Sequence, residues 1–184
     1  MRIANSLAAC MLLFSWDVRA PLAACVFHEK AAHHAGVCAI EVNPHRPWEL
    51  ATGVRGMSAT VLLCPDSARR TAGSYDECVR LWDMRQIRIP VCCAEIPCGG
   101  GVWRLAWHPV DSAVLLAACM QQGFAIVRDG SVVLRYGDGA ASGEHGSLGY
   151  GVAWCSLHDG RHAAVSCSFY DRSVHVWDPL VMQA

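Results

Sequence analysis

The sequence predicts an all-β protein built from repeated antiparallel sheets, and a phrase that occurs twice supports this prediction. Residues 74–83 read SYDECVRLWD, and residues 168–178 read SFYDRSVHVWD. Aligned on Tyr75 and Tyr170, both follow the pattern Tyr-Asp-x-x-Val-x-x-Trp-Asp. A tight turn followed by a short alternating strand that ends in Trp-Asp is typical of one blade of a WD-repeat β-propeller.

The spacing of the Trp-Asp pairs defines the blades. They fall at 16–17, 82–83 and 177–178, and Val127-Arg128-Asp129 stands as a degenerate equivalent. The intervals of 45 and 50 residues after Trp82 suit one four-stranded blade each, whereas the 66 residues before it are about twenty too many. We interpret 54–73 as an insertion within a blade, either a surface loop or a retained intron.

The strands can then be placed along 1–184 as one partial propeller domain of about three blades plus two extra strands. Closed propellers need about four to eight blades. The sequence therefore indicates the C-terminal part of a larger propeller, a truncated chain, or a protein completed by another copy. The expected strands are 11–17 and 24–28; 36–42, 48–52, 78–82 and 91–96; 102–107, 114–120, 124–127 and 132–136; 150–154, 163–167 and 174–177.

Composition excludes several classes of function. The chain is 53% hydrophobic and 17% charged, with a net charge of −1, so disorder is not expected. Because no run of lysine and arginine exceeds two residues, neither nucleic acid nor an anionic membrane is implied as a partner. The apolar run 7–14 fits either a signal peptide or a strand ending at Trp16-Asp17, and we favour the strand in a cytoplasmic protein.

Eleven cysteines are scattered at strand-like positions, and we expect reduced, buried, apolar side chains. Cys92, Cys93 and Cys98 lack the paired C-x-x-C spacing and the histidine cluster of a zinc site. The sequence therefore predicts no metal and no cofactor.

A histidine before the first strand, an aspartate in the turn before the third strand and the tryptophan of Trp-Asp form a hydrogen-bonded network within a WD blade. The same residue types recur with the blade period, so we interpret them as structural rather than as a general base and its orienting carboxylate. The two predicted sets are His34, Asp76 and Trp82, and His145, Asp171 and Trp177.

A second phrase is more specific than the repeat. Residues 99–109 read GGGVWRLAWHP, residues 115–120 read LLAACM, and residues 167–171 read CSFYD. Together these phrases resemble the C-terminal half of the WD-repeat diphthine methyl ester esterase family (older name diphthine methyltransferase) of diphthamide biosynthesis. The resemblance runs from about residue 12 to 177. The chain departs from it at Gln121, where a histidine is expected.

The resemblance implies hydrolysis of the methyl ester of methylated diphthine, a modified histidine on elongation factor 2, with other diphthamide-pathway proteins as further partners. The sequence shows neither a Gly-x-Ser-x-Gly elbow nor an H-E-x-x-H motif, so the site must be inferred from topology. The alternative is a non-catalytic WD-repeat scaffold for protein interactions.

In a propeller, the turns before first strands and those between second and third strands share one end. The catalytic candidates there are Arg104, Cys119 and Glu77. Arg104 lies in an innermost strand, where it fits a residue that holds a carboxylate or polarises an ester carbonyl, or a salt bridge between blades. Cys119 fits a nucleophile or an inert core residue. Trp103 fits blade packing, stacking on an imidazole, or a cation–π contact with a trimethylammonium group. The predicted substrate-binding residues are Trp103, Arg104, Tyr75, Gln121 and Tyr170.

Overall fold

The computed structural model of the 184-residue chain describes the backbone of two short strands, 13–16 and 25–29, and then residues 37–54, 77–85, 89, 91–137 and 145–179. Three predicted site residues lie outside the described residues, namely His34, Tyr75 and Asp76. Residues 55–73 of the predicted insertion also lie outside them. Val54, its first predicted residue, belongs instead to a strand that pairs it with Val37.

Antiparallel strands form the described fold, in chain order within each sheet. We call the two four-stranded sheets the first and middle sheets, and the three-stranded one the last sheet. The first sheet contains β3 (Val37–Val42), β4 (Glu49–Val54), β5 (Cys78–Asp83) and β6 (Val91–Pro97); the middle sheet β7 (Arg104–Trp107), β8 (Val114–Ala118), β9 (Phe124–Arg128) and β10 (Ser131–Tyr136); and the last sheet β11 (Gly151–Ser156), β12 (His162–Ser168) and β13 (Ser173–Trp177). A two-stranded sheet contains β1 (Leu13–Trp16) and β2 (Cys25–Glu29).

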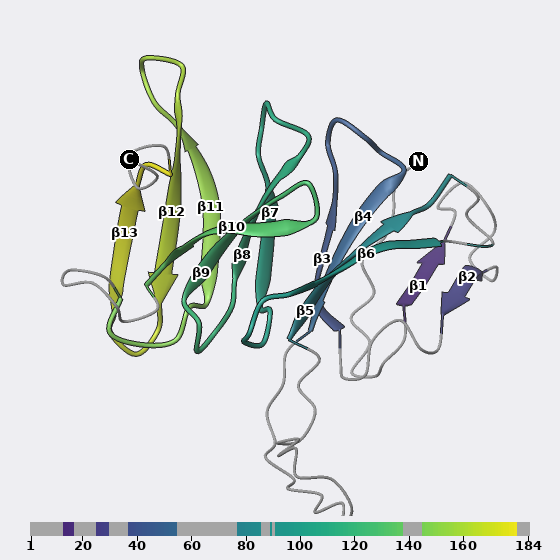
Figure 1. The fold of residues 1–184 in the computed structure, drawn as a ribbon, viewed down its shortest axis with the longest axis horizontal. Helices are drawn as coiled ribbons and strands as arrows, with labels where there is room; N and C mark the ends of the chain where they lie inside the picture. The colour runs from purple at the N-terminus through teal and green to yellow at the C-terminus, as the bar shows by residue number, and fades with distance from the viewer. Residues whose placement is uncertain are drawn as a thin grey trace, which may run out of the picture.

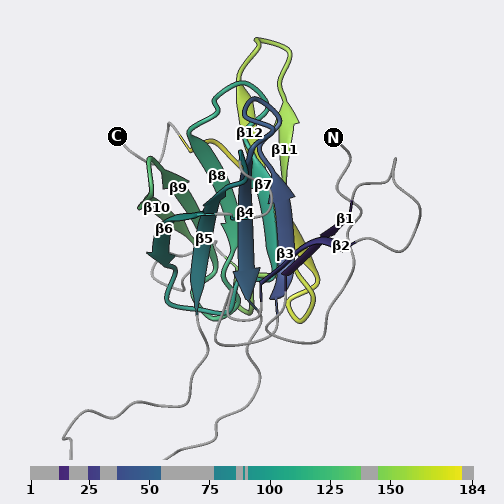
Figure 2. The same ribbon diagram turned by 90° about the vertical axis from the view of Figure 1, so that its right-hand side faces the viewer.

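The three larger sheets stand side by side as blades (Figures 1 and 2). β7 contacts both β3 and β11, so the first strands of successive blades are neighbours. β6 and β10 are the fourth strands of their sheets and lie at the opposite edges. This arrangement confirms the predicted all-β, propeller-type architecture of three blades plus two strands. It places Arg104, the first residue of β7, on an innermost strand, as the sequence indicated.

The core lies between the blades rather than within one sheet. One cluster joins Ala51 and Val79 of the first sheet to Leu115 and Val127 of the middle sheet. A second cluster joins the opposite face of the middle sheet to the last sheet, with Trp177 packed there. Each blade therefore buries both faces wherever it has two neighbours, which explains why β8 is buried along its whole length.

Strand register shows how the middle sheet, which lacks the tryptophan of Trp-Asp, keeps the blade pattern. Trp82 pairs with Leu50, and Trp177 pairs with Ala164, at equivalent places in two blades. In the middle sheet Val127 takes that place, opposite Leu115. Val127 is 2% exposed, so a smaller apolar side chain fills the buried position of the tryptophan.

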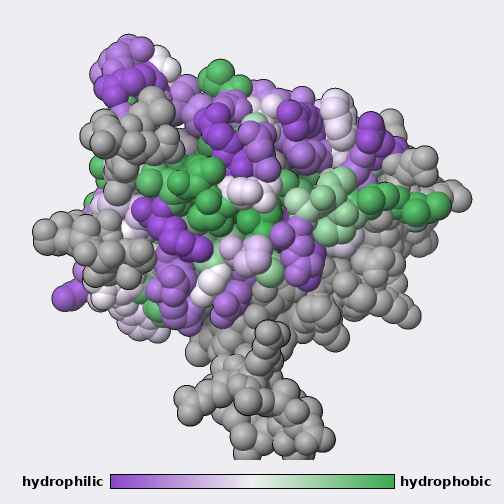
Figure 3. Space-filling model, in the orientation of Figure 1, coloured by the Kyte–Doolittle hydropathy of each residue, from purple (hydrophilic) through white to green (hydrophobic). Residues whose placement is uncertain are grey.

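The expectation that the cysteines are buried is wrong for about half of those described. Among the described cysteines, Cys78, Cys98 and Cys119 are buried, Cys167 is partly buried, and Cys38, Cys92, Cys93 and Cys155 are exposed; none of these eight is in a disulfide. Cys92 and Cys93 lie on β6, which is an edge strand of the first sheet among the described residues. Exposed apolar groups are also visible in Figure 3, where they cross the middle of the face between hydrophilic side chains.

Candidate functional site

Three connections meet at one end of the blades, which we call the loop end: the β6–β7 loop (98–103), the β8–β9 turn (119–123) and the β12–β13 turn (169–172). Strand pairing places them together, because Arg104 at the start of β7 lies opposite Ala118 at the end of β8. An isolated bridge between Met120 and Gly149 then ties the β8–β9 turn to the segment before β11. The loop end is thus formed jointly by neighbouring blades.

Arg104 is exposed at the start of β7. Glu41 of β3 is half-buried and feels the positive charge of Arg104. Burial raises the pKa of Glu41, and the positive charge of Arg104 opposes that rise. The pair therefore sets a guanidinium and a carboxyl on adjacent innermost strands. Glu41 is absent from the sequence-predicted set, although an acidic residue in the otherwise apolar run 36–42 was a usable signal.

Glu77 lies beside the glycine-rich loop. Its backbone has a left-handed φ of 48°, and its carbonyl oxygen accepts a hydrogen bond of 2.7 Å from the backbone N–H of Cys98. Burial raises the pKa of the Glu77 carboxyl. A raised pKa makes the Glu77 carboxylate a stronger base, which suits a proton acceptor.

Cys119 is fully buried at the end of β8. A hydrogen bond with the Cys98 thiol and burial both raise the pKa of Cys119 well above its ordinary value. Because the thiolate is the nucleophilic form, this environment disfavours Cys119 as a nucleophile and favours the core interpretation.

Unlike Cys119, the predicted substrate-binding residues that the structure describes are exposed or partly exposed, whereas Tyr75 lies outside the described residues. Gln121 is exposed on the β8–β9 turn, next to the exposed Gln122. Trp103 meets Tyr150 edge to face, with ring centroids 5.2 Å apart. Tyr170 is 62% exposed on the β12–β13 turn, and its ring centroid is 6.0 Å from that of Tyr150.

One further ring belongs to this group. Phe169 is 74% exposed and lies 5.3 Å from Tyr170 and 6.4 Å from Tyr150, measured between ring centroids. The sequence phrase 167–171 contained Phe169, but neither Phe169 nor Tyr150 was predicted as a site residue. Only the fold shows that they share a cluster with Trp103 of the preceding blade.

The second predicted network is assembled in the last sheet. His145 Nδ1 is 2.9 Å from an Asp171 carboxylate oxygen, and His145 Nε2 is 3.0 Å from Ser166 Oγ. Trp177 donates from Nε1 to the same Ser166 oxygen at 3.1 Å. Ser166, which the sequence analysis missed, therefore links the histidine to the tryptophan. Burial opposes ionisation of Asp171, but hydrogen bonds from Ser173 and His145 lower its pKa to about 2.

Ser166, His145 and Asp171 match the order of a catalytic triad in geometry. Burial argues against that role, since Ser166 is 1% exposed and His145 is 2% exposed. The first sheet repeats the tryptophan part of the network, with Trp82 Nε1 donating to Thr52 Oγ1 at 3.0 Å. We therefore assign the arrangement to blade stability. His34 and Asp76, the other members predicted for that blade, lie outside the described residues.

The middle sheet replaces this network with apolar groups. Val127 and Ala117 stand where the last sheet has Trp177 and Ser166. Cys98 precedes Trp103 by the same five residues that separate His145 from Tyr150. The Cys98–Cys119 thiol pair thus occupies the part of this blade where its neighbour has a histidine-centred network.

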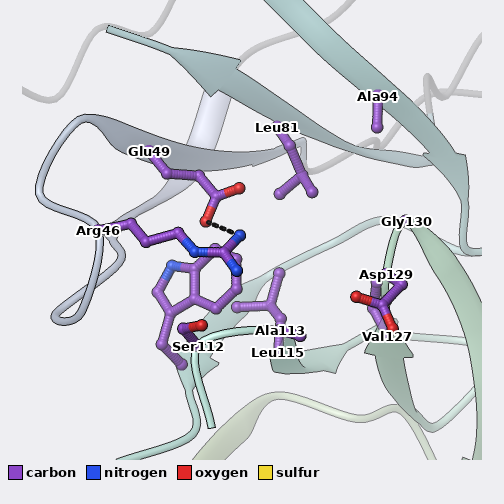
Figure 4. A pocket seen from close by; sticks show the side chains of 11 residues that line it. Arg46, Glu49, Leu81, Ala94, Ser112, Ala113, Leu115, Val127, Asp129 and Gly130 are labelled. Atoms are coloured by element: carbon purple, nitrogen blue, oxygen red, sulfur yellow. Dashed lines mark ion pairs between the residues drawn. The ribbon is translucent and has the colours of Figure 1, made fainter. Parts of the chain in front are cut away.

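Two cavities open at the opposite end of the blades. One, of about 180 Å³, lies between the first and middle sheets. Figure 4 shows Arg46 and Glu49 at its mouth, joined by an ion pair of 3.9 Å, above Leu115. The other, of about 280 Å³, lies between the middle and last sheets and is lined by His108 and His162, among others. Neither cavity includes a predicted site residue.

In the described part of the chain, no three histidine, cysteine or acidic residues gather as they would to hold a metal ion. No helix within the described residues is long and apolar enough to cross a membrane.

Comparison with known protein families and solved structures supports the propeller fold. A model of the "WD domain, G-beta repeat" family matches residues 54–83, which end on Trp82-Asp83. A chain of the crystal structure of the Mitotic Checkpoint Complex superposes with a TM-score of 0.59 at 19% identity, covering 90% of this chain and 42% of its own. Fold and motif together define a WD-repeat protein of the β-propeller class.

Proteins with similar sequences identify the family more specifically than the fold does. Diphthine methyltransferase of Mus musculus is 41% identical over 149 residues, which are 79% of this chain and 26% of the mouse protein. The Homo sapiens protein of the same name is 37% identical and covers 79% and 28%, and a homologue from Dictyostelium discoideum is 35% identical and covers 58% and 31%. The chain is a homologue of the WD-repeat diphthine methyltransferase family and spans 26–31% of these relatives' length.

Proposed function

We propose that this chain acts in diphthamide biosynthesis by hydrolysing the methyl ester of methylated diphthine on elongation factor 2. The family relationship supports a role in this pathway. The observation that favours ester chemistry is the exposed Arg104 at the loop end, on an innermost strand, with a carboxyl of raised pKa on the neighbouring strand. We place this function in the cytoplasm, where elongation factor 2 works.

Ester hydrolysis adds water to the carbonyl carbon, places negative charge on the carbonyl oxygen, and then releases methanol and a carboxylate. A guanidinium presents several N–H donors in a fixed fork, and in this proposal Arg104 stabilises that developing oxyanion. Glu77 and Glu41 are the loop-end and inner-strand carboxyls whose pKa is raised by burial. Either can accept the proton of the attacking water and return it to the departing methoxide.

A non-catalytic scaffold is the second candidate. It is favoured by the burial of the one described Ser-His-Asp arrangement and by the buried Cys119, since neither gives an accessible nucleophile. Under this alternative, the exposed aromatic rings of the loop end would contact a partner protein.

The direct test is to incubate the purified 184-residue chain with elongation factor 2 that carries methylated diphthine, and to measure methanol release and the loss of one methyl group by mass spectrometry. Elongation factor 2 carrying unmodified histidine serves as the control. We expect one methanol per modified histidine. A folded chain that binds the factor without releasing methanol would favour the scaffold.

A further inference from the structure

We propose that Tyr150, Phe169 and Tyr170 form a binding site for a quaternary ammonium group at the loop end. The three rings form one contiguous cluster in which each ring contacts the other two, with centroids 5.3 to 6.4 Å apart. Trp103 supports the cluster from the preceding blade through its edge-to-face contact with Tyr150. The identity of the ammonium group as part of modified histidine rests on the proposed function.

The two rings of the turn lie at the surface, as do Val174 and Val176 of the adjoining β13, which are 67% and 63% exposed. Phe169 and Tyr170 are 74% and 62% exposed, although large apolar side chains next to a blade junction are ordinarily buried there. In the middle sheet the equivalent β8–β9 turn carries Gln121 and Gln122 instead, so the turn itself does not require aromatic residues. Two exposed rings on consecutive residues present π faces to solvent, and such faces attract cations.

Local anchoring keeps the cluster in place. The backbone N–H of Tyr150 donates to the carbonyl of Cys167 at 3.1 Å, which fixes the start of β11 against β12. The β12–β13 turn is held by Asp171, which accepts hydrogen bonds from the backbone and side chain of Ser173. The rings are therefore presented by a rigid turn, which lowers the entropy lost when a ligand binds.

The charged residues beside the cluster are one carboxylate and two arginines. Asp171 adjoins Tyr170 in the chain, and Arg172 follows it with a left-handed φ of 56°. Arg104 adjoins Trp103, on the other side of the cluster. A substrate that carries both a trimethylammonium group and an ester can place the first over the rings and direct the second toward Arg104. Trimethylammonium is bulky and weakly hydrated, so aromatic faces can replace its water at little cost.

The experiment uses two small probes of nearly the same shape, choline and its uncharged carbon isostere 3,3-dimethylbutan-1-ol. Binding to the intact chain is followed by ligand-observed NMR. We expect choline to bind at least several-fold more tightly than the isostere. Tyr170→Leu and Phe169→Leu should each weaken choline binding by about 2- to 5-fold, the range for an exposed cation–π contact. Tyr170→Phe, which keeps the ring, should leave binding within about 2-fold.

Trp48→Leu is the matched control, since Trp48 is 45% exposed on the β3–β4 turn at the opposite end. It should leave choline binding unchanged. Equal binding of the two probes, or no binding of choline to a chain with an intact thermal transition, would overturn the proposal. Because no hydrolysis is measured, this result is separate from the methanol assay: a chain can bind choline and release no methanol, or the reverse.

Discussion

Trp154 donates a hydrogen bond of 3.0 Å from its indole Nε1 to the backbone carbonyl of Ala106 in the neighbouring blade. Trp107, at the equivalent place one blade earlier, donates in the same way to the carbonyl of Glu41, at 3.4 Å. Successive innermost strands (β3, β7 and β11) are thus joined by a repeated side-chain bond. This bond fixes the relative height of the strands that carry Arg104 and Glu41.

We expect Trp154→Phe to lower the free energy of unfolding by about 1–2 kcal/mol, because the carbonyl of Ala106 loses its donor and a smaller ring fills the space. Urea denaturation followed by circular dichroism measures this change. Trp48→Phe, at an exposed ring, is the control and should change stability by less than about 0.5 kcal/mol. Equal effects of the two variants would show that the bond does not stabilise the blade junction.

Asp171 makes stability depend on acid pH. Its carboxyl is partly desolvated, yet hydrogen bonds from Ser173 and His145 lower its pKa in the folded chain from 3.8 to about 2. A carboxyl with a lowered folded-state pKa stabilises the fold fully above its unfolded pKa, and this contribution is lost as the pH falls through the folded value. The contribution should therefore be complete at pH 5 and fade toward pH 2.

The measurement compares Asp171→Asn with the unmodified chain by urea denaturation across pH 2 to 7. The variant should be less stable by about 1–3 kcal/mol at neutral pH, and the difference should shrink toward pH 2. Asp111→Asn, which removes a surface ion pair of 3.2 Å with Arg128, serves as the control. A difference that stays constant with pH would assign the loss to packing rather than to the Asp171 charge.

Gly100 lies where the glycine-rich loop passes the end of β8. A Cβ added at Gly100 would overlap the carbonyl oxygen of Cys119, which is backbone and has little room to move. We expect Gly100→Ala to lower the free energy of unfolding by about 1–3 kcal/mol through overpacking. Gly146→Ala is the matched control, since nothing lies within 4 Å of its added Cβ. A tolerated Gly100→Ala would mean that the loop can shift away from the β8–β9 turn.

The sequence was sufficient for the sheets because Trp-Asp strands and their spacing recur with the blade. Even the blade without that tryptophan could be placed, since Val127 keeps the register opposite Leu115. Strand ends were less predictable: β8 stops at Ala118 because Met120 turns with a left-handed φ of 42°, a conformation that residue type does not announce. The insertion predicted at 54–73 stays a prediction for 55–73, which lie outside the described residues, whereas Val54 belongs to β4.

The site was less predictable than the fold for a physical reason. Periodicity identifies which end of a strand a residue occupies, and it thereby located Arg104, Gln121 and Tyr170. It does not identify neighbours contributed by another blade, so the ring of Tyr150 beside Trp103 and the carboxyl of Glu41 near Arg104 emerged only from packing. Ser166 was missed for the same reason, because serine in a strand is chemically unremarkable until its partners are known.

The final prediction concerns Arg104 and the proposed hydrolysis. Arg104→Ala should lower kcat/KM for the diphthine methyl ester by about 10²–10³, the usual effect of removing an oxyanion donor. Stability should change by less than about 1 kcal/mol, because the side chain is exposed. Both quantities are measured on one purified variant, by methanol release and by urea denaturation. Arg128→Ala, an exposed arginine at the opposite end of the middle sheet, is the matched control.

Arg104→Lys separates charge from geometry. Lysine keeps the positive charge but lacks the planar fork that gives two parallel hydrogen bonds. Because a fixed fork is what positions donors on a carbonyl oxygen, the lysine variant should recover only part of the lost rate while keeping the effect of charge on Glu41. If Arg104 instead serves as a structural link between blades, Arg104→Ala will lower the melting temperature and leave turnover per folded molecule near normal. That outcome would remove Arg104 from the site and leave Glu77 and Gln121 as the loop-end residues to test next.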